Sequence, residues 1–125
     1  MNESSRDIVA GHGTFAAGIL SALEQIAGRA DRFIAVSNAD LEPGAIEALL
    51  RDTIATHRSR VIFTDLSAGS CTIAARRIQR DQPDLVVVTG VALPTILSYA
   101  CGGALLKSVE RGRTALTMVE GTRDS

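Results

Sequence analysis

The chain has 125 residues, of which 46% are hydrophobic and 22% are charged, so it has room for one compact domain and not for two. Its formal net charge of -1 and its aromatic content of 3% argue against a nucleic-acid partner and against a stacking surface for bases or sugars. We therefore expect a single domain over residues 1–125, with a disordered tail at 121–125.

Neither the cysteines nor the N-terminal residues indicate export or metal binding. Cys71 and Cys101 lie far apart in the sequence, without a second ligand suited to zinc beside them, which predicts reduced thiols. The first residues lack the pattern of a signal peptide, and no apolar run approaches the ~20 residues of a membrane span. We expect a cytoplasmic protein that does not insert into a membrane.

Short apolar runs alternate along the chain with segments of helical period. The runs are continuous, as in strands covered on both faces, and predict strands at 8–10, 33–36, 61–63 and 85–88. Apolar stripes predict helices within 15–26 and 46–54, from about 70 to 80, within 93–101, and from 103 to about 120, with Gly112 as a weak point. These stripes place Ile26, Leu49, Ile73 and Cys101 on packed faces.

This alternation of strands and helices predicts the fold class. It implies right-handed crossovers and a parallel sheet with helices on both faces. We predict a single-domain α/β fold with a doubly wound, four-stranded sheet in the order 2-1-3-4. In that order the loops after the first and third strands share the switch-point crevice, where open α/β sheets bind ligands.

Residues with useful chemistry occur in both of those loops, at 11–16 and 64–70. We expect His12 and Asp65 to face each other there, above two helix N-termini that favour anions. An imidazole can attack phosphorus through one ring nitrogen while the other donates its proton to an acceptor such as Asp65. Backbone N–H groups around Gly13 and Ser70, with the hydroxyls of Thr14 and Ser70, could hold the phosphoryl oxygens. No metal or other cofactor is required.

Each of these residues also has a purely structural interpretation. His12 lies between two glycines and could be a turn residue, and Asp65 could form an Asx turn or cap a helix. Thr14 and Ser70 are residue types that are common at helix caps. The residue pattern alone leaves both interpretations open.

Three stretches carry a family resemblance: residues 8–13 before an alanine-containing helix, residues 63–70 followed by Ala74-Ala75-Arg76, and residues 88–94. In this order and spacing they resemble the mannose-type enzyme IIA domains of the bacterial sugar phosphotransferase system. The chain differs from the family at Ala68-Gly69-Ser70-Cys71, where the family usually has Gly-Gly-Thr/Ser-Pro, and at Ala92, where the family often has asparagine.

The resemblance implies a phosphoryl-relay protein. His12 would accept a phosphoryl group from the histidine-containing phosphocarrier protein and pass it to an enzyme IIB for sugar uptake, within a membrane-associated complex. Asp65 would be the orienting partner of His12, and Gly13, Thr14 and Ser70 would contact the phosphoryl group.

The resemblance also implies a homodimer, which we expect to be built mainly from helices because no fifth apolar strand follows the last helix. Similar domains serve as the phosphoryl donor subunit for dihydroxyacetone kinase. A regulatory relative without phosphoryl transfer is a further alternative.

Two other motifs suggest different functions. Residues 11–16 fit the dinucleotide pattern G-x-G-x-x-A, but no acidic residue ends the second strand to bind a ribose. Cys71 and Arg77 fit the C-x5-R pattern of cysteine-dependent phosphatases, but the intervening residues favour a helix instead of a phosphate-binding loop. We expect Cys71 to be buried and inert, and His57 to be a surface residue near a helix end.

Overall fold

The computed structural model describes residues 5–122 and contains a four-stranded parallel sheet in the order β2-β1-β3-β4. The strands are β1 (Asp7–Gly11), β2 (Phe33–Ser37), β3 (Val61–Thr64) and β4 (Val86–Val88). This confirms the predicted fold class and strand order. The expectations for the first four residues and for 123–125 lie outside the described residues.

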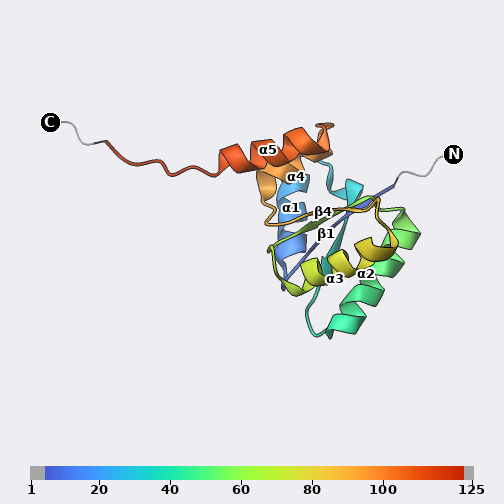
Figure 1. Ribbon diagram of the computed structural model, residues 1–125. Helices are drawn as coiled ribbons and strands as arrows, with labels where there is room; N and C mark the ends of the chain where they lie inside the picture. The colour runs from blue at the N-terminus through green and yellow to red at the C-terminus, as the bar shows by residue number, and fades with distance from the viewer. Residues whose placement is uncertain (1–4, 123–125) are drawn as a thin grey trace.

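Five α-helices cover the two faces of the sheet (Figure 1). The helices α2 (Pro43–His57) and α3 (Ser70–Asp81) lie on one face, and α1 (Phe15–Ala27) and α4 (Leu93–Ala100) lie on the other. The last helix, α5 (Leu105–Ala115), packs on α4, and a short 3-10 helix (Ala30–Arg32) leads into β2. None of the helices within residues 5–122 is long and apolar enough to cross a bilayer.

Strand β1 occupies the centre of the fold because its side chains are apolar on both faces. Ile8 and Ala10 pack in the core shared with α2 and α3, whereas Val9 packs in the core shared with α1 and α4. All three side chains are fully buried. The continuous apolar run is therefore explained by a strand with helices on both sides.

The end of one predicted helix and the predicted burial of several side chains are wrong. Helix α5 ends at Ala115 and not near residue 120, and the residues after it extend away from the body of the protein (Figure 1). Gly112 lies within α5, and a side chain there would collide with Thr95, so glycine allows α5 to cross α4 closely.

The other corrections concern which side chains face the core. Helix α3 buries residues 71, 74, 75 and 78, which have the i, i+3, i+4, i+7 spacing, so Ile73 faces outward and is 51% exposed. Ile26 and Leu49 are also exposed. Cys101 follows the last residue of α4 and is exposed, so its predicted packing is wrong.

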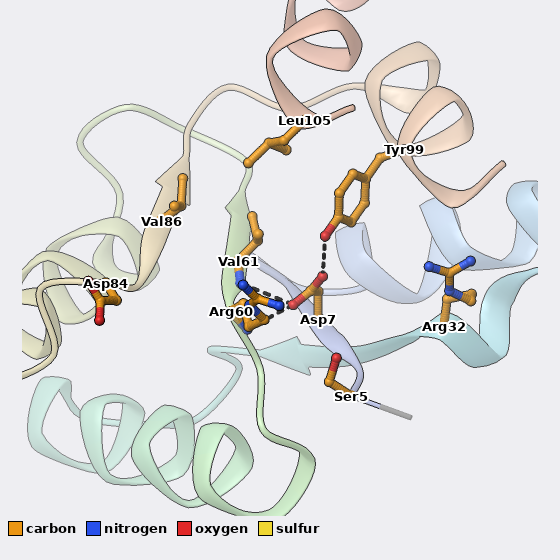
Figure 2. Close-up of a pocket in the computed structure, with 9 residues that line it drawn as sticks. All are labelled: Ser5, Asp7, Arg32, Arg60, Val61, Asp84, Val86, Tyr99 and Leu105. Carbon is orange, nitrogen blue, oxygen red and sulfur yellow. Dashed lines mark hydrogen bonds between the residues drawn. The ribbon is translucent and has the colours of Figure 1, made fainter. Parts of the chain in front are cut away.

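Asp7 ties three elements together at the amino edge of the sheet (Figure 2). Its Oδ1 accepts hydrogen bonds from the backbone N–H groups of Arg60 and Val61, and its Oδ2 accepts one from the Tyr99 hydroxyl at 2.6 Å. Burial and the contact with Asp7 raise the pKa of Tyr99 to about 12. Because the carboxylate is fully partnered, we interpret Asp7 as a structural residue.

The two thiols should differ sharply in reactivity. Cys71 is fully buried, and burial followed by the charge of Asp65 raises its pKa to about 11, so at pH 8 it carries almost no reactive thiolate. A disulfide reagent such as DTNB should label Cys101 rapidly in the native protein, and C101S should react only after denaturation. Rapid labelling of native C101S would contradict the burial of Cys71.

Candidate functional site

His12 and Asp65 come together at the carboxyl edge of the sheet. His12 follows the last residue of β1 and Asp65 follows the last residue of β3, and these strands are neighbours. The Asp65 Oδ2 accepts a hydrogen bond from the His12 backbone N–H at 2.9 Å. The same oxygen lies 2.8 Å from Nδ1 of the His12 ring. The two residues are therefore in direct contact, as the predicted strand order requires.

The carboxylate determines which ring nitrogen carries the proton. Burial opposes ionisation of Asp65, but the two hydrogen bonds from His12 and the attraction of its ring together hold the pKa of the carboxyl below its usual value. An ionised carboxylate can only accept, so Nδ1 must donate. The Nε2 nitrogen is left as the basic, nucleophilic position, on a side chain that is 51% exposed.

The close approach of Asp65 depends on Gly11. A side chain at Gly11 would lie 2.9 Å from Oδ2 of Asp65 and 2.8 Å from the ring of Phe15, too close for either to remain in place. Gly13 adopts a positive φ of 53°, which turns the chain from His12 into α1. The two glycines that flank His12 thus have separate structural roles.

The loop that carries Asp65 is braced by a pair of threonines that the sequence analysis did not single out. The hydroxyl of Thr72, in the first turn of α3, donates to the Leu66 carbonyl and lies 2.6 Å from the Thr64 hydroxyl. Thr64 and Thr72 are both buried. The sequence does show a threonine on each side of this candidate loop, but it does not show that the two side chains are buried or which groups they contact.

Two helix N-termini open beside the exposed edge of the His12 ring. Neither Thr14, before α1, nor Gly69, before α3, caps its helix with a side chain, so the first N–H groups of both helices lack that partner. Gly69 lies against the ring: a side chain there would be 3.1 Å from the His12 Cε1. This places the amino end of α3 beside Cε1, the ring carbon between Nδ1 and Nε2, where the helix end favours an anion.

The predicted phosphoryl contacts differ in their surroundings. Gly13 and Thr14 are exposed beside His12 at the start of α1. Ser70 is half-buried at the start of α3, and its Oγ accepts a hydrogen bond from Nδ2 of Asn38 at 2.8 Å. Asn38 directly follows β2, and the sequence analysis did not single it out.

The structure also bears on the competing motifs. Cys71 and Arg77 both lie within α3, so no phosphate-binding loop separates them. His57 is half-buried as the last residue of α2, and its carbonyl accepts from the Arg6 N–H. Across residues 5–122, no three His, Cys, Asp or Glu side chains are grouped so that they could hold a metal ion.

The depressed pKa of Asp65 predicts an acid-sensitive contribution to stability. A carboxyl with a lower pKa in the folded than in the unfolded state stabilises the fold fully above the unfolded pKa of about 3.9, and this stabilisation is lost as pH falls through the folded pKa. Urea unfolding from pH 7 to pH 2.5 should show wild type more stable than D65N at neutral pH, with the difference shrinking below pH ~4. A difference that grows on acidification would refute this assignment.

The chain was compared with protein families and with known proteins. Residues 7–111 match the family model EIIA-man, described as "PTS system fructose IIA component". A search of curated proteins found no match to the chain.

Solved structures with the same fold are named as enzyme IIA components. The mannose/sorbose-specific IIA subunit of the phosphotransferase system from Enterococcus faecalis has a TM-score of 0.80 at 20% identity, covering 98% of this chain and 100% of that one. The PTS IIA protein associated with the fucose utilization operon of Streptococcus pneumoniae has a TM-score of 0.83 at 22% identity, covering 94% and 96%. Component EIIA from Streptococcus agalactiae has a TM-score of 0.80 at 20% identity, covering 90% and 95%.

These structural similarities concern the fold, whereas the family model spans most of the sequence, including both loops that form the crevice. The chain therefore belongs to the EIIA-man family of phosphotransferase-system enzyme IIA components.

Proposed function

We propose that the protein relays a phosphoryl group in the cytoplasm, accepting it on His12 from the histidine-containing phosphocarrier protein and passing it to an enzyme IIB for sugar uptake. The observation that carries this proposal is the contact between Nδ1 of His12 and Oδ2 of Asp65, which leaves Nε2 free on a ring whose Cε1 faces the amino end of α3. Family membership supplies the expected donor and acceptor.

The transfer step follows from that contact. The lone pair of His12 Nε2 attacks the phosphorus of the donor phosphohistidine, a new N–P bond forms, and the donor N–P bond breaks. The proton on Nδ1 stays in place, because Asp65 stabilises the positive charge that develops on the ring. Donation to the acceptor runs the same chemistry in reverse. No proton is lost and no redox change occurs.

The phosphoryl group carries negative charge, and the surroundings of Nε2 suit it. We assign its contacts to the backbone N–H groups at Gly13 and at the start of α3, with the Thr14 and Ser70 hydroxyls. Phosphoryl transfer depends mainly on positioning and charge stabilisation, which these groups supply without a metal.

Replacement of each histidine tests the phosphorylated position. Intact mass spectrometry after incubation with phosphoenolpyruvate, enzyme I and the phosphocarrier protein should show one acid-labile phosphoryl adduct in wild type and none in H12A. The chain has two histidines, so H57A is the matched control and should be phosphorylated like wild type. An adduct that persists in H12A would refute the assignment.

The same assay tests the role of Asp65. The D65N variant keeps an acceptor for the His12 backbone N–H but loses the negative charge next to Nδ1. A lost charge-assisted hydrogen bond is worth about 1.5–3 kcal/mol, so phosphoryl transfer should slow roughly 10- to 100-fold. An unchanged transfer rate would mean that Asp65 has only a structural role.

If wild type accepts a phosphoryl group but transfers none to an enzyme IIB, dihydroxyacetone kinase becomes the acceptor to test. No acceptance by wild type would indicate a non-catalytic relative.

We also propose that the protein is a homodimer. Exposed apolar side chains include Val86 on the edge strand β4, which is 42% exposed, and Leu116, Met118 and Val119 after α5, which are each more than 80% exposed. A second copy could cover these side chains, which argues for a different interface from the helical one that the sequence suggested.

Light scattering coupled to size exclusion tests the dimer. The wild type should have twice the 13.1 kDa mass of one chain, and the triple variant L116S/M118S/V119S should have the mass of one chain. The control T117S/E120Q changes polar residues of the same segment and should remain dimeric. A monomeric wild type would contradict the proposal.

A further inference from the structure

Asn38 connects the loop after β2 to the start of α3. It follows Ser37, the last residue of β2, and its side-chain Nδ2 donates to Oγ of Ser70 at 2.8 Å. Both residues are half-buried, and they come from different loops at the carboxyl edge of the sheet. The hydrogen bond therefore joins two walls of the crevice that holds His12.

The backbone of Asn38 is held in place from both sides. Its N–H donates to the carbonyl of Gly11 at 3.1 Å, and its own carbonyl accepts from the Leu41 N–H at 3.1 Å. Gly11 is the residue before His12, so Asn38 is anchored to the loop that carries the histidine. These two hydrogen bonds fix the backbone of Asn38, and with it the position from which the side chain extends to Ser70.

The direction of this hydrogen bond determines what the Ser70 hydroxyl can do. A side-chain amide nitrogen only donates, so Ser70 uses an oxygen lone pair to accept and keeps its own proton for another acceptor. Within residues 5–122 no acceptor for that proton is present. Ser70 directly follows Gly69, which lies against the His12 ring. An anionic group on the neighbouring His12 ring could accept that proton.

We propose that Asn38 is a positioning residue that orients the Ser70 hydroxyl to donate to the phosphoryl oxygens as they arrive at His12. This inference rests on the proposed function and adds a residue to it. Asn38 makes no contact with the phosphoryl group in this scheme, because its amide acts through Ser70.

The two substitutions N38A and N38D distinguish orientation from simple bracing of the loops. N38A removes the donor and frees the Ser70 hydroxyl to rotate. N38D can still form a hydrogen bond to Ser70, but a carboxylate only accepts, so it would take the Ser70 proton away from the phosphoryl group. If Asn38 only holds the two segments together, N38D should transfer the phosphoryl group at the wild-type rate. If Asn38 orients the Ser70 hydroxyl, N38D should be slower.

The experiment measures the steady-state rate of phosphoryl transfer from the phosphocarrier protein to an excess of enzyme IIB, relayed by catalytic amounts of wild type, N38A, N38D, S70A or the double variants N38A/S70A and N38D/S70A. The control S37A removes a hydrogen bond from the same turn, between the Ser37 hydroxyl and the Ala39 N–H, without touching Ser70. Thermal unfolding of every variant shows whether the fold is retained.

We expect S70A and N38A each to lower kcat by about tenfold, the loss of one hydrogen bond, with KM for the phosphocarrier unchanged. N38D should be slower than N38A. The double variant N38A/S70A should be no slower than S70A, because Asn38 acts through Ser70. S37A should transfer like wild type.

Three results would overturn the inference while leaving the relay intact: N38D as fast as wild type, losses in N38A and S70A that multiply in the double variant, or an S37A loss as large as that of N38A. A wild type that accepts no phosphoryl group on His12 would instead overturn the proposed function, and the inference with it. In a protein without the Ser70 hydroxyl, any further slowing caused by N38D measures the direct repulsion between the introduced carboxylate and the phosphoryl group. If that slowing is as large as the whole effect of N38D in the presence of Ser70, the inference is overturned as well.

Discussion

One carboxylate oxygen, Oδ2 of Asp65, determines the geometry on which the candidate site depends. It accepts from the backbone N–H of His12 and from the ring Nδ1, so it fixes both the loop and the ring. This double contact requires that β1 and β3 be neighbours and that position 11 lack a side chain. The strand order and Gly11 therefore have a common explanation in the approach of Asp65 to His12.

The Asp65 carboxylate is charged, nearly buried and only partly hydrogen-bonded. The Asp65 side chain is only 10% exposed, and its Oδ1 is buried without a hydrogen-bond partner, which is costly for a charged group. The contacts with His12 outweigh the cost of burial, as the lowered pKa of the Asp65 carboxyl indicates. Thr64 and Thr72 brace the loop below, so the loop that carries Asp65 is supported by hydrogen-bonded polar side chains. At the opposite edge of the sheet, Asp7 has every partner it needs.

Much of this fold could be predicted from the sequence because continuous apolar runs and helical stripes have few compatible topologies. The predicted strand order alone is enough to place His12 and Asp65 in one crevice. The position of Asn38 could not be predicted, because the hydrogen bond to Ser70 joins loops that are 32 residues apart. The outward orientation of Ile73 and the end of α5 at Ala115 were missed because apolar residues continue the helical pattern where no surface covers them.

The most direct test of the account is the identity of the ring nitrogen that carries the phosphoryl group. Two-bond proton–nitrogen NMR spectra of the protein with 15N-labelled histidine, before and after phosphorylation, would assign the proton and the phosphorus to individual nitrogens. The account predicts a protonated Nδ1 throughout and a phosphoryl group on Nε2 of His12. A phosphoryl group on Nδ1 would contradict it, because that nitrogen would then have to leave Asp65.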